Sequence, residues 1–218
     1  MTIHNLSEQS SIINQFVAEL RDISIQQDSM RFRKNLERIG EIIAYEISKT
    51  LAYKTHNVQT PLGVSEVPLC SDQVVLSTIL RAGLPFYSGF LNVFDKAENA
   101  FVSAFRKYKR DYSNFQIIVE YMSSPSLENK VLILTDPMLA TGSSMELAFH
   151  GLLQRGMPKY IHLASAIASK QGIEYVSQIF PKEKTTVWTA AIDPELNEHS
   201  YIVPGIGDAG DLSFGQKI

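Results

Sequence analysis

The sequence is poor in cysteine. Cys70 is the only cysteine among the 218 residues, so the chain cannot form an intramolecular disulfide or a cysteine-rich zinc cluster. A lone cysteine is more often a buried structural residue than a nucleophile, and we expect Cys70 to be buried. This cysteine usage is typical of a protein of the reducing cytosol.

Long apolar runs and an excess of basic residues are also missing. No stretch approaches the ~18 apolar residues of a membrane span, and the opening residues MTIHNLSEQS lack the features of a signal peptide. Lys and Arg total 20 against 23 Asp and Glu, a net charge of -3, so no overall positive field is available to hold nucleic acid. We therefore expect a cytoplasmic protein without a membrane or nucleic-acid partner.

The remaining composition is that of a globular protein, with 44% hydrophobic and 20% charged residues. This length suits a single domain over residues 1–218. Apolar residues recur at helical spacing over 6–22 and again over 32–51, which predicts two amphipathic helices within about the first 55 residues. The segment 60–68, TPLGVSEVP, is rich in helix and strand breakers and is interpreted as a connection.

The middle of the chain alternates strand-like and helix-like segments. Predicted strands cover 74–80, 130–136, 161–169 and 187–192, and predicted helices cover 84–94, 145–155 and 172–180. Such alternation favours an α/β fold in which right-handed crossovers build a parallel sheet with helices on both faces. Two further strand-like runs, 100–105 and 115–122, flank a charged tip and predict a projecting β-hairpin. Beyond Ile192 we expect irregular, glycine-rich chain.

A polar turn follows the predicted strand at 130–136 and precedes a helix. Asp136 stands at the carboxyl end of the strand, where ligands of open α/β sheets bind, and its carboxylate can accept hydrogen bonds from ribose hydroxyls. Backbone N–H groups of the turn and of the helix start can surround a phosphate. The residues of this cradle are Thr141, Gly142, Ser143 and Ser144.

In isolation, these residues would more often be a helix cap and a turn. No Gly-Lys-Ser/Thr follows the strand, and the turn contains no lysine. The Walker pattern is therefore absent, which disfavours ATP or GTP hydrolysis.

The segment DPMLATGSS resembles the loop that binds 5-phosphoribosyl-1-diphosphate (PRPP) in uracil phosphoribosyltransferases, a branch of the type I phosphoribosyltransferase fold. Relatives that act on purines or orotate carry two adjacent acids there, whereas Asp136 is followed by Pro137 and Met138. The resemblance implies a catalytic role for Asp136 and PRPP binding along the whole loop. That loop consists of Asp136, Pro137, Met138, Leu139, Ala140, Thr141, Gly142, Ser143 and Ser144.

A second dense segment runs from Ala190 to Gly215. Its glycines and prolines permit a tight pocket built from backbone, although composition alone is equally that of a surface loop. PGIGDAGD resembles the uracil-binding loop of the same family, which implies that about 190–218 recognises the base. The residues implied to contact uracil are Ile202, Gly207, Asp208 and Ala209, with Asp208 also catalytic and near PRPP.

Two arginines are candidates for the pyrophosphate of PRPP, which needs cationic partners as it leaves. Arg81 lies in ILRAGL and Arg106 at the base of the predicted hairpin. The resemblance implies that both bind PRPP and that Arg106 acts in catalysis. The run KYK, residues 107–109, stands where relatives carry acids. Lys107, Lys109 and Arg110 could close over the pyrophosphate if the hairpin moves, but a charged tip more often only protects an exposed strand edge. Ser143 likewise replaces a usual glycine.

The resemblance implies transfer of the phosphoribosyl group of PRPP to uracil, with Mg²⁺ carried by PRPP. The histidines show no metal-ligand spacing, and no metal ligand is expected from the protein's side chains. A homodimer or higher oligomer is implied, with GTP as an effector in some members. The alternative is a regulator that senses pyrimidines and PRPP on the same fold and acts by binding RNA or a protein.

Overall fold

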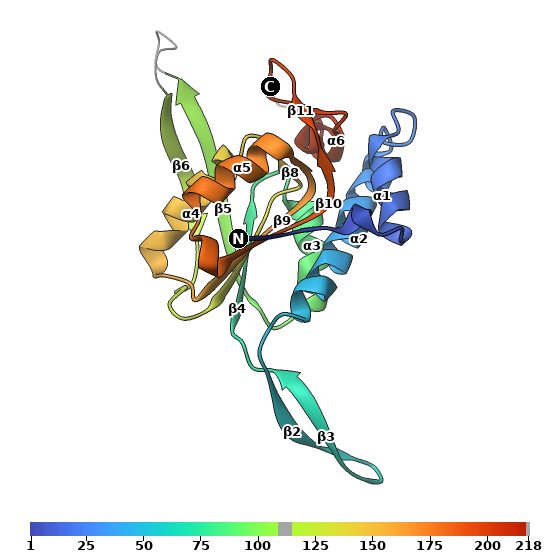
Figure 1. Cartoon of the computed structure of the whole chain (residues 1–218), viewed down its shortest axis with the longest axis vertical. Helices are drawn as coiled ribbons and strands as arrows, with labels where there is room; N and C mark the ends of the chain where they lie inside the picture. The colour runs from blue at the N-terminus through green and yellow to red at the C-terminus, as the bar shows by residue number, and fades with distance from the viewer. Residues whose placement is uncertain (109–114, 217–218) are drawn as a thin grey trace.

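A mainly parallel sheet of eight strands forms the centre of the molecule (Figure 1). The computed structural model describes residues 1–108 and 115–216, and for 104–108 and 115–120 it describes the backbone alone. The elements, in chain order, are β1 (Thr2–Asn5), η1 (Leu6–Glu8), α1 (Ile12–Arg21), α2 (Ser29–Ser48), β2 (Tyr53–Thr60), β3 (Gly63–Cys70), β4 (Val74–Ile79), α3 (Leu84–Val93), β5 (Glu98–Tyr108), β6 (Phe115–Ser123), β7 (Val131–Thr135), β8 (Met138–Leu139), α4 (Ser143–Leu152), η2 (Leu153–Arg155), β9 (Tyr160–Ser169), α5 (Lys170–Ile179), η3 (Lys182–Lys184), β10 (Thr185–Asp193), β11 (Glu195–Leu196), β12 (Ile202–Val203) and α6 (Ala209–Phe214).

The sheet confirms the predicted parallel topology. Its strand order is β1-β10-β9-β7-β4-β5-β6, with β8 added beside β9. All these pairs are parallel except β5–β6, which is antiparallel. Strands β4 and β7 are buried along their whole length, as expected for short apolar runs in a sheet covered on both faces.

Helices cover both faces of the sheet, as the alternation of elements predicts (Figure 1). Side chains alternate between the faces along each strand. Leu76 and Ile133 pack into the core beneath α1, α2 and α3, whereas Val75 and Leu132 pack into a second core beneath α4 and α5. Because these strands are parallel, their carboxyl ends lie together at one end of the sheet.

The prediction that helices open the chain is wrong for the first residues. Strand β1 comes first and pairs in parallel with β10, with Thr2 opposite Thr186. The first α-helix begins at Ile12, after Ser11, whose hydroxyl accepts a hydrogen bond from the Ile13 N–H. Helical periodicity is a local signal, and it cannot reveal a strand whose partner lies more than 180 residues away.

The segment interpreted as a connection belongs to a second hairpin. Strands β2 and β3 pair antiparallel from Tyr53–Cys70 to Thr60–Gly63, and they extend away from the opposite end of the sheet (Figure 1). We call the hairpin of β2 and β3, residues 53–70, the β2–β3 arm. Cys70 is its last residue and is exposed, so the expectation of a buried cysteine is wrong. Both strands are largely exposed, which removes the apolar alternation that normally identifies strands.

The projecting hairpin predicted at 100–122 is confirmed for its strands. Strand β5 pairs with β4 only over 98–102, and its remainder up to Tyr108 pairs with β6 alone. These two strands rise beyond the sheet (Figure 1). The predicted roles of Lys109 and Arg110 lie outside the described residues, and so does the side chain of Lys107.

The C-terminal segment is more regular than the sequence predicts. Strand β10 runs to Asp193, β11 and β12 form a short antiparallel pair, and helix α6 follows. The Asp208 carboxylate caps α6 by accepting a hydrogen bond from the Asp211 N–H at 2.9 Å. Elements of two to six residues are too short to produce a periodic apolar pattern.

Close packing of α2 against α3 gives a first prediction. A Cβ on Gly89 would lie 2.0 Å from the Glu37 carbonyl oxygen, so Gly89→Ala must separate the two helices. We expect a loss of about 1–3 kcal/mol in the free energy of unfolding, measured by urea denaturation. Gly63→Ala is the control, because no atom lies within 4 Å of a Cβ there. Equal stability of the two variants would contradict this packing.

Candidate active site

The loop after β7 is held in place by the neighbouring strand β9. The Asp136 N–H donates to the Ala164 carbonyl at 3.1 Å, and the Pro137 carbonyl accepts from the N–H groups of Ala166 and Ile167 at 3.1 and 3.0 Å. These bonds place Asp136 at the carboxyl end of the sheet, as predicted.

The predicted phosphate cradle leads directly into α4. Gly142 has a φ of +83° and a Cβ there would lie 2.8 Å from Cδ1 of Tyr175, so glycine is required on both conformational and steric grounds. Gly142 has no side chain to cap α4, and the Ser143 N–H makes a long hydrogen bond of 3.4 Å to the Thr141 hydroxyl. First-turn N–H groups of a helix that lacks such a cap are suited to bind an anion. The hydroxyl oxygens of Thr141 and Ser143 lie 3.0 Å apart in the same turn.

Arg81 follows β4 and contacts the C-terminal helix. Its Nη2 lies 3.1 Å from the Asp211 carboxylate and also donates to the Gly215 carbonyl. The guanidinium is therefore fixed beside α6, and its buried Nε–H has no hydrogen-bond partner among the described residues.

The residues predicted to contact uracil lie in contrasting environments. Ile202 is 7% exposed and Ala209 is fully buried, and both side chains belong to the core. Gly207 is exposed and has a φ of +77°, and the part-buried Asp208 caps α6.

A cavity joins the phosphate loop to the C-terminal segment. It has a volume of about 200 Å³ and is lined by Met138 and Ala140 on one side and by residues 199–202 on the other. Most ligand pockets measure roughly 300–1,000 Å³, so this space suits a small, single-ring molecule. A smaller space of about 50 Å³ lies along the loop from Asp136 to Met145.

Comparison with known proteins identifies the family. The family model described as uracil phosphoribosyltransferase matches residues 7–216. The chain belongs to the uracil phosphoribosyltransferase family. A uracil phosphoribosyltransferase of Porphyromonas gingivalis is 58% identical over 218 residues, covering all of both chains. One from Methanothermobacter thermautotrophicus is 39% identical over 191 residues, covering 87% of this chain and 86% of that one.

Solved structures share the fold of this family member. The AQ2163 protein from Aquifex aeolicus matches over the whole of both chains with a TM-score of 0.86 and 28% identity. A hypoxanthine phosphoribosyltransferase from Staphylococcus aureus has a TM-score of 0.50 and 14% identity, covering 80% of this chain and 85% of that one. At that identity the second likeness shows the fold alone.

The structure of this uracil phosphoribosyltransferase family member brings together most of the predicted site. The loop and the C-terminal segment meet at the 200 Å³ cavity, and Arg81 contacts α6. Arg106 lies in β5 opposite Ile117, with its side chain outside the described part of the chain. Ser200 and Tyr201 also line the cavity, and nothing in their spacing distinguishes them in the sequence.

Metal-binding clusters and membrane spans are absent from the described part of this family member. No group of three or more His, Cys, Asp and Glu residues there could hold a metal ion. Within the same residues, no helix combines the length and the apolar character needed to cross a bilayer.

The Asp136 carboxyl group has an unusual environment. Loss of hydration raises its pKa from 3.8 to about 7, and only a hydrogen bond from the Met138 N–H opposes this rise among the described residues. Asp136 is partly buried, and a carboxylate that loses hydration without gaining a cationic partner is destabilised in its charged form. A ligand that donates hydrogen bonds to this carboxylate would therefore relieve that cost.

This environment predicts that Asp136 destabilises the ligand-free protein at neutral pH and above. Because the folded-state pKa is raised from 3.8 to about 7, the wild type loses stability progressively as the pH rises from about 4 to about 7, and Asp136→Asn escapes this loss. We expect the variant to be more stable by on the order of 2–4 kcal/mol at pH 8, with the advantage disappearing towards pH 4. Urea denaturation across this pH range measures the difference, with Asp95→Asn on an exposed turn as the control. A pH-independent difference would contradict the assignment.

Proposed function

We propose that this chain transfers the phosphoribosyl group of PRPP to uracil, forming uridine monophosphate and pyrophosphate. The observation that carries the proposal is the small cavity where Met138 and Ala140 of the phosphate loop face the C-terminal segment. A relative named uracil phosphoribosyltransferase that is 58% identical over the full length supports the choice of base. No observation on the structure favours the alternative regulator.

The phosphate loop is proposed to bind the 5-phosphate and the ribose of PRPP. The 5-phosphate would lie on residues 141–144, where α4 begins without a side-chain cap. Asp136 would accept hydrogen bonds from the ribose hydroxyls, which compensates its carboxylate for lost hydration. Residues 137–140 complete the lining, and the bonds from β9 keep their backbone in place.

Arg81 and Arg106 are proposed to face the pyrophosphate. The unpaired Nε of Arg81 supports this role, since a buried donor without a partner gains from an anionic ligand. Mg²⁺ is proposed to enter the site together with PRPP. When bound there, Mg²⁺ would offset the negative charge of the leaving group.

Backbone groups of the C-terminal segment are proposed to recognise uracil. Gly207 is exposed and offers its backbone groups directly, Ile202 lines the cavity, and Asp208 and the buried Ala209 complete the set. Uracil presents two carbonyl acceptors and an imide N–H, whereas cytosine reverses one of these polarities. A fixed backbone can therefore reject cytosine by leaving a polar group unpaired.

The proposed reaction depends on positioning. N1 of uracil attacks the anomeric carbon as the bond to pyrophosphate breaks, and the ribose acquires cationic character in the transition state. The proton on N1 is released to water. The carboxylates of Asp136 and Asp208 would stabilise the positive charge on the ribose. Arg81 and Arg106 would stabilise the negative charge on the departing pyrophosphate. No covalent intermediate on the protein is required.

Uridine monophosphate formation from PRPP, Mg²⁺ and each of uracil, orotate, cytosine and hypoxanthine tests the proposal. We expect turnover with uracil alone, and a loss of about 10²-fold or more in Asp136→Asn. Repeating the assay with GTP tests the effector that the resemblance implies. PRPP binding without turnover of any base would favour the regulator, which a titration with RNA would then examine. Near-normal turnover in Asp136→Asn would overturn its assignment.

Self-association into a homodimer or higher oligomer is part of the proposal, and so is a cytoplasmic location. The β2–β3 arm supports association because it exposes apolar side chains, with Leu62 at 100% and Val64 at 63%. An exposed cysteine with no disulfide partner suits a reducing compartment.

The arm gives a prediction for assembly. Replacing Leu62 and Val64 together by Lys should shift the protein towards monomer in sedimentation velocity, because burying a lysine at an interface is costly. Thermal stability of the monomer should change little, as both side chains are exposed. Met157→Lys, which changes a residue that is 48% exposed after α4, is the control. An unchanged oligomeric state in the double variant would contradict this role of the arm.

A further inference from the structure

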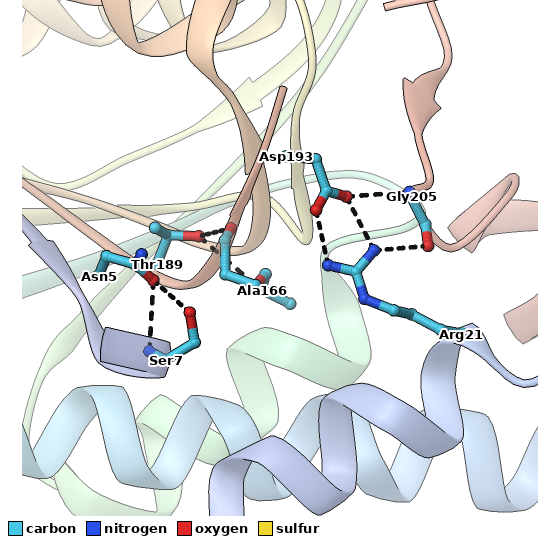
Figure 2. A network of polar contacts seen from close by, with 8 residues as sticks. Asn5, Ser7, Arg21, Ala166, Thr189, Asp193 and Gly205 are labelled. Atoms are coloured by element: carbon cyan, nitrogen blue, oxygen red, sulfur yellow. Dashed lines mark hydrogen bonds and ion pairs between the residues drawn. The ribbon is translucent and has the colours of Figure 1, made fainter. Parts of the chain in front are cut away.

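Three segments that are distant in the sequence meet at Gly205 (Figure 2). Arg21 ends α1 and Asp193 ends β10. The two terminal nitrogens of Arg21 donate to the two carboxylate oxygens of Asp193, each at 2.8 Å. Nη1 of Arg21 also donates to the Gly205 carbonyl at 3.0 Å, and the Gly205 N–H donates to Asp193 Oδ2 at 2.9 Å.

Gly205 is thus fixed through both of its backbone polar groups. It has a φ of +60°, and a Cβ there would lie only 2.1 Å from the Ile202 carbonyl oxygen. The turn is too tight for any residue but glycine. Because Gly205 lies between Ile202 and Gly207, its position determines how the chain passes from one proposed base contact to the next.

The flanks of this turn are fixed by separate contacts. Ile202 pairs with Leu196 in the short β11–β12 ribbon on the preceding side. On the following side, Asp208 caps α6. The Arg21–Asp193 pair supplies the remaining restraint between these two points.

A second contact links the end of α1 to the same segment. The Gln26 side chain is 9% exposed and its Nε2 donates to the carbonyls of Leu20 and Arg21 at 3.3 and 3.1 Å. Its Oε1 lies 3.7 Å from the point that a Cβ on Gly207 would occupy. The chain that follows α1 therefore lies close to Gly207 as well.

The pair is strong enough to act as a restraint. The Asp193 side chain is 6% exposed and that of Arg21 is 24% exposed, so solvent screens their attraction weakly. A two-pronged arginine–carboxylate contact also fixes orientation, which a lysine cannot reproduce. The Arg21–Asp193 pair therefore holds Gly205 rigidly, next to the residues proposed to bind uracil.

We propose that Arg21 is a positioning residue for uracil: through Asp193 and Gly205 it holds the backbone that presents Ile202 and Gly207 to the base, whereas Asp208 is held separately by its cap on α6. The inference rests on the proposed function, because it takes 202–209 as the uracil-binding segment. Loosening this restraint should weaken uracil binding selectively, since the PRPP loop is anchored independently by β9.

The test is steady-state kinetics of Arg21→Lys with uracil and PRPP varied in turn, at a temperature where the variant is folded. We expect the KM for uracil to rise at least 10-fold, while the KM for PRPP and kcat each change less than 3-fold. Arg31→Lys is the matched control. Arg31 makes an equally two-pronged contact with Glu19, at 2.9 and 2.7 Å, and should lose stability without a change in either KM.

A second variant keeps the inference testable if Arg21→Lys folds poorly. Asp193→Asn retains an acceptor for the Gly205 N–H but loses the negative charge that attracts the Arg21 guanidinium. The KM for uracil should again rise, while kcat and the KM for PRPP change little. An unchanged KM for uracil in either folded variant, or a parallel rise in both KM values, would overturn the positioning role. Wild-type protein without uracil turnover would instead overturn the proposed function and this inference together.

Discussion

The hydrogen bonds between β9 and the loop after β7 are the constraint on which the rest of the site depends. They extend beyond Asp136 and Pro137, because Ser169 at the end of β9 donates from its hydroxyl to the Ala140 carbonyl at 2.6 Å. The same hydroxyl caps α5, so one side chain joins the loop, the strand and the helix. Gly172 allows this approach, since a Cβ there would lie 2.4 Å from the Ala140 carbonyl oxygen.

A loop fixed in this way can hold an ionisable group in an unfavourable environment. Asp136 remains poorly hydrated, with its pKa raised to about 7, because the backbone on both sides of it is already bonded to β9. Arg81 is restrained on the far side by Asp211 and Gly215 of the C-terminal segment. Charged groups that are held in place before the substrate arrives need little reorganisation during the reaction.

Much of the fold could be predicted from the sequence, because buried strands and amphipathic helices leave local patterns. The strands β4 and β7 and the helices α3 and α5 were found in this way, and the turn from Asp136 to Ser144 was recognisable from its resemblance to a family. Strand β1 was not predictable, since its pairing with β10 is a long-range property. The Arg21–Asp193 pair was equally hidden: its members are 172 residues apart and neither belongs to a motif. The roles of the individual site residues stay predictions.

The pairing of β1 with β10 has a consequence for synthesis of the protein. During translation, β1 and α1 leave the ribosome well before their partners Thr186 and Asp193 are made. Closing so long a loop must await the synthesis of β10. The growing polypeptide can therefore complete the phosphate loop before it can complete the C-terminal segment, and the two halves of the site mature in a fixed order.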